Sequence, residues 1–207
     1  MERARALRTG FLVAVPAVTG AVLLAHPDDP QRGGVVQGLG DVTTRWLAVH
    51  VGLLLLLPLL ALWVWIALAG IRTLAARLAR VAAVVFAALY SSFDALVGIG
   101  TGVLVREAVA LGDPAAFALA ERWWEVPAPI WVFSTLGPLS WVVAAGAAGL
   151  AHLRAGSGWI VAAPVALAGP LFGFGHPLLT GPIGMLLLAF AAVALARNPP
   201  PNGRTFP

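Results

Sequence analysis

One acidic residue lies in the middle of a long apolar stretch of the chain. Asp94 falls within residues 81–105, and the other acids lie outside stretches of this kind. An acid at the centre of a membrane-spanning helix costs about 3 kcal/mol on insertion scales, and such residues usually face the interior of a bundle or a water-filled cavity. The position is therefore typical of an acid that binds a proton or a cation, or that acts as a general base.

Small and polar residues recur at helical spacing around Asp94, so we expect its side chain to face inward. This stripe consists of Tyr90, Ser91, Gly98, Thr101 and Gly102. The residues predicted to bind an ion or a substrate are Asp94, Tyr90, Ser91, Thr101 and His50.

A structural role explains Asp94 equally well. A protonated acid can bond to a hydroxyl group, or to a backbone carbonyl that a proline releases from its helix. Pro58 releases the carbonyl of Leu54, and Pro138 releases that of Ser134, each within a turn or two of the depth expected for Asp94. The sequence leaves both roles open.

Three histidines are expected on the outer side of the membrane. His26 closes the first apolar stretch, His50 lies near the start of the second, and His176 precedes the last. Because imidazole is the commonest zinc ligand, these three could form a zinc site above Asp94. No HxxxH or HExxH spacing supports such a site, and a haem would need two facing histidines within the spans. We therefore expect no cofactor.

The composition excludes a soluble protein. Of the 207 residues, 60% are hydrophobic and 11% are charged, whereas soluble domains carry about a quarter charged residues. The chain has no cysteine, which excludes disulfides and thiolate chemistry. All 13 basic residues are arginine, and alanine, glycine and proline are abundant, which is typical of a GC-rich bacterial genome. We expect an integral membrane protein whose basic character does not imply a nucleic-acid partner.

Six apolar stretches approach the length of about 20 residues that a membrane-spanning helix needs. We expect an all-α bundle that forms one domain over residues 1–197, with a short disordered tail at 198–207. The first span is expected to remain uncleaved, because Leu23 stands where a signal peptidase needs a small residue. The expected spans are 10–25, 46–70, 81–105, 129–151, 158–173 and 177–196.

The arginines indicate the orientation, because short cytoplasmic loops collect positive charge. Both termini are expected on the cytoplasmic side of the cell membrane, which also places most acids outside. The inner arginines are then Arg3, Arg5, Arg8, Arg72, Arg77, Arg80, Arg154, Arg197 and Arg204, and the outer ones are Arg32, Arg45, Arg106 and Arg122.

The loop after the third span predicts a short amphipathic helix. Asp113 followed by Pro114 is typical of a helix start. Phe117, Ala120 and Trp124 then share one face, so the helix is expected to lie on the outer leaflet as a lid or an anchor.

Tryptophans are expected to mark both membrane interfaces. His152, which lies beside Arg154, is expected at the inner interface, and Trp141 is expected to pack deeper in the bundle. The outer belt would comprise Trp46, Trp123, Trp124 and Trp131, and the inner belt Trp63, Trp65 and Trp159.

Two glycine patterns concern the helices themselves. Gly98 and Gly102 form a GxxxG spacing, which lets another helix approach closely and could serve a partner helix or a homo-oligomer. Residues 164–182 are dense in proline and glycine and predict a broken helix, a feature found at transporter binding sites.

The layout resembles the small six-helix membrane proteins of unassigned function in high-GC actinobacteria. The resemblance covers most of the chain and consists of a basic N-terminus, RWLAVH entering the second span, YSSFDALVGIGTG in the third and a tryptophan-bearing outer loop. It implies a six-helix membrane fold and brings no activity or residue roles. The alkaline ceramidase-like hydrolases share a set of histidines, serine and aspartate, but the paired HxxxH of their last helix is absent.

The residues favour a small transporter or a ligand-responsive accessory protein, with an outward-facing polar cavity around Asp94. One alternative is a membrane-embedded, metal-dependent hydrolase that uses His26, His50 and His176. The other is a structural subunit of a membrane complex. The expected partners are the lipid bilayer and a small solute, proton or cation.

Overall fold

The structure is a computed structural model, and it describes residues 2–27, 34–125, 128–175 and 179–197. Three of the positions discussed above lie outside these ranges: the expected tail at 198–207, His176 and Arg32. Every regular element in the described ranges is a helix. The all-α prediction is therefore confirmed for the part of the chain that the structure describes.

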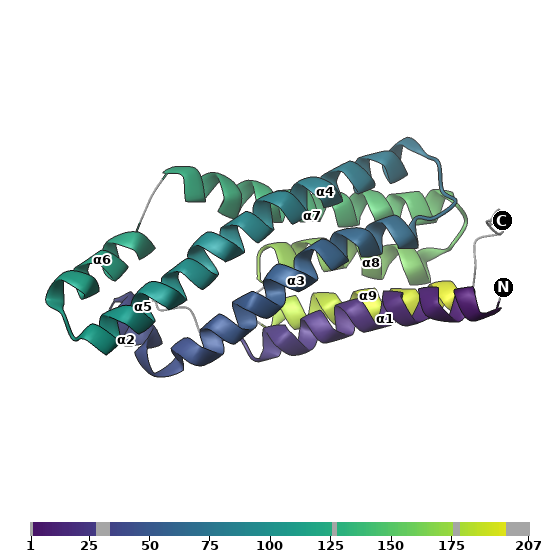
Figure 1. The fold of residues 1–207 in the computed structure, drawn as a ribbon. Coiled ribbons are helices and arrows are strands. Elements are labelled where there is room, and N and C mark those ends of the chain that lie inside the picture. Colours follow the sequence, from purple (N-terminus) through teal and green to yellow (C-terminus); the bar gives the residue numbers. More distant parts are fainter. Residues whose placement is uncertain (1, 28–33, 126–127, 176–178, 198–207) are drawn as a thin grey trace.

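The helices follow one another up and down the molecule (Figure 1). Five helical stretches are long and apolar enough to cross a membrane, and α8 is a shorter apolar helix. These properties are those of an integral membrane protein. In chain order the helices are α1 (Glu2–Leu24), α2 (Val35–Leu39), α3 (Thr43–Ala67), α4 (Leu74–Phe93), α5 (Gly100–Leu111), α6 (Pro114–Trp124), α7 (Ala128–Arg154), α8 (Trp159–Gly173) and α9 (Thr180–Arg197).

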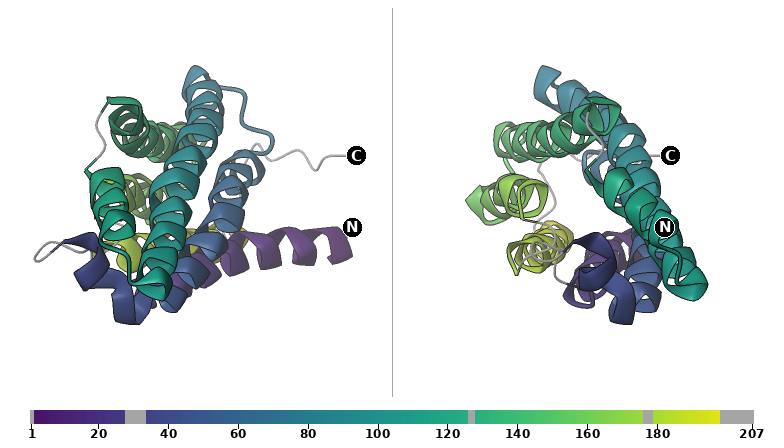
Figure 2. Two further views of the ribbon diagram at one scale, coloured as in Figure 1. Left: turned by 60° about the vertical axis from the view of Figure 1, so that its left-hand side comes forward. Right: turned by 90° about the vertical axis from the view of Figure 1, so that its left-hand side faces the viewer.

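The long helices form a closed ring in chain order. Starting from α1, the ring passes through α3, α4, α7, α8 and α9, and α9 packs against α1 again. Figure 2 shows this arrangement along the bundle. The start of α1, the end of α9 and the α3–α4 and α7–α8 connections share one end of the bundle, and we call it the terminal end (Figure 1). The short helices α2 and α6 lie at the opposite end; we call the pair the lid, and this end the lid end.

The expected third span is longer than predicted. Helices α4 and α5 form one continuous stretch of 38 residues, Leu74–Leu111, which corresponds to about 57 Å at 1.5 Å per residue. The stretch passes through one π-helical segment, Asp94–Ile99, which we call the π segment. Since a bilayer core is about 30 Å thick, the stretch is longer than one membrane crossing needs. Its α5 end packs against the two helices of the lid.

Small residues allow the helices of the ring to approach closely. In α7, a Cβ atom at Gly149 would come within 2.6 Å of the Ala162 carbonyl oxygen of α8. Larger side chains fill the centre, where Phe86, Trp141 and Phe172 are fully buried and their rings contact one another. Close backbone approach at small residues is the usual basis of helix association in membranes.

Arginines at the terminal end donate to carbonyl groups in the last turns of helices or just beyond them. Arg5 donates to the Ala196 carbonyl of α9 at 2.9 Å. Arg8 donates to the Ile66 carbonyl of α3 at 3.1 Å. The Ile66 carbonyl also accepts from the Ala69 amide at 3.2 Å. The positive charge of both arginines is favourable at the negative end of the helix dipole.

The tryptophans differ from the expected belts. Trp65 and Trp159 are exposed, at 48% and 70%, as an interfacial position requires. Trp46 and Trp63 are both only 2% exposed, so their assignment to the belts is wrong. The Trp63 indole N–H donates to the Leu12 carbonyl of α1 at 2.7 Å. Pro16 lies four residues after Leu12 and has no N–H to offer that carbonyl, so a buried tryptophan supplies the missing donor.

We predict that Trp63→Phe destabilises the protein more when Pro16 is present than when it is replaced by alanine. The substitution leaves the Leu12 carbonyl without a donor, which costs about 1–3 kcal/mol. Pro16→Ala provides an amide N–H for the same carbonyl, so the additional cost of Trp63→Phe should shrink in that background. Unfolding of the purified protein in detergent, monitored by circular dichroism, measures the loss of stability caused by Trp63→Phe in each background.

Trp141→Phe is the matched control for this cycle. Trp141 donates to the Ala168 carbonyl at 3.3 Å, and the residue four positions later is Phe172, which has its own amide N–H. The loss of stability caused by Trp141→Phe should be the same with Pro16 and with Pro16→Ala. An equal loss for Trp63→Phe in both backgrounds would contradict the role given to its indole.

Candidate functional site

The π segment interrupts the regular hydrogen bonding of the longest helix. The Gly100 amide bonds to the Ala95 carbonyl, five residues earlier. Two tryptophans from other elements donate to carbonyls of the segment: Trp46 of α3 to Gly98 at 2.6 Å, and Trp123 of α6 to Leu96 at 3.3 Å. Short π-helical turns of this kind occur frequently at functional sites.

Asp94 begins the π segment and faces His50 of α3. The distance from His50 Nε2 to Asp94 Oδ1 is 4.0 Å, and both side chains are less than a tenth exposed. The other ring nitrogen, Nδ1, lies 2.8 Å from the Trp46 carbonyl oxygen. A carbonyl only accepts, so Nδ1 carries the hydrogen and Nε2 is the nitrogen that faces the acid. The sequence placed both residues at the site, but their pairing is a finding of the structure.

The glycines of the GxxxG pattern make this pairing possible. A Cβ atom at Gly98 would overlap the His50 ring, and one at Gly102 would come within 2.9 Å of Trp46. The predicted close approach is therefore made by α3 of the same chain. Because this face is buried under α3, a second copy of the chain could not pack on Gly98 and Gly102 without displacing that helix.

Residues of the predicted polar stripe face two different helices, α3 and α8. Asp94 faces α3, whereas Tyr90 packs against Phe172 of α8 with ring centroids 6.1 Å apart. Among the described residues, Asp94 Oδ2 and the hydroxyls of Ser91 and Thr101 are buried and have no hydrogen-bond partner. The structural role of Asp94, as a protonated acid bonded to a hydroxyl or to a carbonyl released by a proline, stays a prediction beside the functional one.

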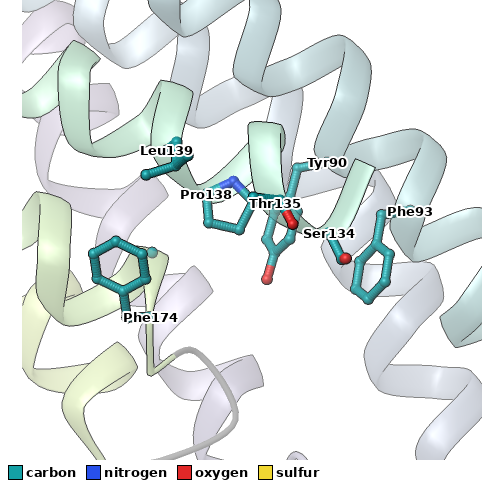
Figure 3. Close-up of a pocket in the computed structure, with 8 residues that line it drawn as sticks. Tyr90, Phe93, Ser134, Thr135, Pro138, Leu139 and Phe174 are labelled. Carbon is teal, nitrogen blue, oxygen red and sulfur yellow. The ribbon is translucent and has the colours of Figure 1, made fainter. Parts of the chain in front are cut away.

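A cavity lies one helical turn from Asp94, on the side of α7 and α8 (Figure 3). Its volume is about 420 Å³, and Asp94 does not line it. Aromatic rings and hydroxyl groups meet in it, and the Tyr90 hydroxyl points into the space. The lining residues are Tyr90, Phe93, Ser134, Thr135, Pro138, Leu139, Gly173 and Phe174.

Two short helices cover the site at the lid end. The sequence correctly predicted α6, and Asp113 caps it by accepting a bond from the Ala115 amide at 2.9 Å. Its apolar face packs on protein instead of on the outer leaflet: Ala120 is buried, and Phe117 and Trp124 pack against a cluster of buried residues from α2, α3 and α5. Figure 1 shows α6 beside α2 and α5.

A carboxylate joins the two helices of the lid. Glu121 of α6 accepts bonds from the Val35 and Val36 amides at 2.8 and 3.1 Å, at the first turn of α2. Beneath it, Trp124 packs against Trp46, with ring centroids 6.3 Å apart. The lid therefore reaches the residues around Asp94 directly.

His26 is close to His50, as the zinc hypothesis requires. Their ring centroids are 5.0 Å apart, and His26 Nδ1 lies 2.5 Å from the Pro27 carbonyl oxygen. The described residues contain no group of three potential ligands placed to hold a metal ion. His176, the third histidine of the zinc hypothesis, lies outside those residues.

A fourth histidine occupies an unexpected position. His152 is only 1% exposed, so its expected place at the membrane interface is wrong. Its Nδ1 lies 3.2 Å from the Ser157 hydroxyl, and the Ser157 amide donates to the His152 carbonyl at 3.0 Å. His152 therefore links the last turn of α7 to the turn that follows it. The spacing to Ser157 within a glycine-rich turn is the only sequence signal for this role.

Comparisons with known protein families, with curated proteins and with solved structures find no match to this chain.

We predict that the purified protein carries no stoichiometric zinc, and that His50→Ala and His176→Ala leave the metal content unchanged. The reason is that His50 directs Nδ1 to a carbonyl and Nε2 to Asp94. Elemental analysis measures the metal directly. His152→Ala is the control, since His152 lies at the other end of the bundle. Near-equimolar zinc that is lost in His50→Ala but retained in His152→Ala would establish a metal centre.

Proposed function

We propose that the chain is a small proton-coupled or cation-coupled transporter with six membrane spans, in which Asp94 and His50 form the ion-binding site. One observation carries this proposal: a buried acid and a buried histidine face each other at a π segment inside the membrane-spanning helices. Acids and histidines in such positions are typical of proton relays and ion pathways.

The geometry supports a site for a single proton. When His50 Nε2 and the Asp94 carboxyl group hold one proton between them, the pair has no net charge. The proton on the carboxyl group gives two neutral side chains, and the proton on Nε2 gives a positive histidine beside a negative aspartate. A low-dielectric environment disfavours a net charge, so adding or removing a proton changes the energy of the whole pair. The titratable group that the described residues place directly against Asp94 is His50, with His26 next to His50.

The proposed solute site is the cavity beside Tyr90. Tyr90 lies one turn before Asp94 on the same helix, so a change in the π segment reaches the cavity wall directly. The lid closes the opposite side of the site through Trp123 and Trp124. A ligand-responsive accessory protein would use the same elements without net transport.

The proposed topology places the terminal end in the cytoplasm and the lid end outside, in the cell membrane. It rests on the arginines, because short cytoplasmic loops collect positive charge. The described arginines of the terminal end are Arg3, Arg5, Arg8, Arg72, Arg77, Arg80, Arg154 and Arg197, and those of the lid end are Arg45, Arg106 and Arg122. In this topology α8, although short, counts as the fifth of six spans.

We predict that Asp94→Asn folds normally but abolishes proton movement. Asparagine has the size and polarity of aspartic acid but does not titrate. In vesicles that contain the protein and a trapped pH dye, an imposed potential should drive a proton flux through the wild type. The flux through Asp94→Asn should equal that of protein-free vesicles. Infrared difference spectra between high and low pH should also lose a carboxyl band.

Two further variants make this test specific. Asp41→Asn removes an acid from the lid end that makes no ion pair within the described residues, and it should leave the flux unchanged. Asp94→Leu should lower stability, because it leaves the buried His50 Nε2, which lies 4.0 Å from the Asp94 carboxylate, without an acidic partner. A normal flux through Asp94→Asn, or no wild-type flux above protein-free vesicles, would refute the proton-site proposal.

We predict that single cysteines at the two ends of the longest helix are labelled from opposite sides. The chain has no cysteine of its own, so there is no background. Leu74 and Leu111 are 79% and 69% exposed, so a thiol at either position should be reactive. In intact cells, a membrane-impermeant reagent should label Leu111→Cys, and it should label Leu74→Cys only after permeabilisation. The reverse pattern would invert the proposed topology.

A further inference from the structure

A basic pocket lies at the terminal end, at the connection between α3 and α4 (Figure 1). Its volume is about 500 Å³. It is far along α4 from the π segment and shares no residue with the Asp94 site. The pocket is lined by Trp65, Ala69, Gly70, Ile71, Arg72 and Arg80.

The guanidinium group of Arg80 is held in place by the end of α3. One of its nitrogens donates to the Leu68 carbonyl at 2.7 Å and to the Ile71 carbonyl at 3.1 Å. The group also lies over the Trp65 ring, 5.6 Å from the centroid, a cation–π arrangement. A guanidinium has five N–H donors, so these contacts orient Arg80 and leave donors for a ligand.

The positive charge around the pocket has no acidic partner among the residues that the structure describes. The ion pairs among the described residues are His50 with Asp94 and Arg106 with Glu107, and neither is near the pocket. Arg72 and Arg80 both line the pocket. The pocket is therefore complementary to an anion.

Apolar side chains continue from the pocket along the surface of α4. Val81 and Val84 are 63% and 52% exposed, and the Trp65 ring is 48% exposed. In an integral membrane protein, exposed apolar groups on a spanning helix face acyl chains, and an exposed tryptophan near the helix end marks the headgroup level. The anion bound here would thus have an apolar surface directly below it.

We propose that this pocket binds the headgroup of an anionic phospholipid. Arg72 and Arg80 contact the phosphate, Trp65 lies at the headgroup level, and the acyl chains follow the exposed face of α4. Basic pockets between membrane-spanning helices are a known mode of anionic lipid recognition. The lipid would bind at the α3–α4 connection whether or not Asp94 carries a proton.

The test is native mass spectrometry of the full chain in detergent, with equal amounts of phosphatidylglycerol and phosphatidylcholine that carry identical acyl chains. The wild type should retain phosphatidylglycerol in preference. Since a basic residue near an anionic lipid surface contributes about 1 kcal/mol, Arg72→Gln and Arg80→Gln should each reduce that preference roughly fivefold. Arg72→Gln is the decisive variant, because Arg72 makes no hydrogen bond within the described residues, whereas Arg80 also holds the end of α3.

Arg77→Gln is the matched control, since it removes the same charge from α4 without altering the pocket lining. It should retain the wild-type preference. An equal loss in Arg77→Gln and Arg72→Gln, or no preference in the wild type, would overturn the proposal. Displacement of the lipid by excess glycerol phosphate would also overturn it, because the pocket would then bind a soluble phosphate.

Discussion

In a hydrocarbon environment, each backbone carbonyl released from a helix needs a donor from elsewhere in the protein. This constraint determines where the tryptophans and arginines of the chain are used. Trp63 donates to the carbonyl that Pro16 leaves open, and Trp46 donates to the π segment. At the terminal end, Arg5 and Arg8 donate to carbonyls in the last turns of α9 and α3. Residue types usually associated with membrane interfaces thus act as hydrogen-bond donors between helices.

The same constraint shapes the surroundings of Asp94. Trp46 bonds to the π segment with its indole and accepts from His50 with its carbonyl, so one residue orients the histidine and satisfies the interrupted helix. Gly98 leaves the space that the His50 ring occupies. The proposed ion site and the break in the helix are therefore parts of one arrangement, and the lid covers it through tryptophans of α6.

The sequence was informative where the physics is local. The apolar length of each stretch predicted the long helices, Asp113 predicted the start of α6, and the cost of an isolated acid predicted that Asp94 is buried. Features that depend on tertiary contacts were not predictable. No periodicity indicates a π segment, so the pairing of Asp94 with His50 was missed. The burial of Trp46, Trp63 and His152 depends on which helix lies opposite, and residue type alone does not reveal it.

The closed ring has a consequence for the order of biosynthesis. Helix α1 borders both α3 and α9, and α9 follows every other helix of the ring in the chain. While α4 to α9 are still being made, α3 is the neighbour available to α1, and Trp63 is the side chain that bonds to its proline-released carbonyl. The side of α1 that faces α9 therefore stays exposed to lipid until α9 has been made. The α1–α3 pair is the natural nucleus of assembly, and the arrival of α9 is its last step.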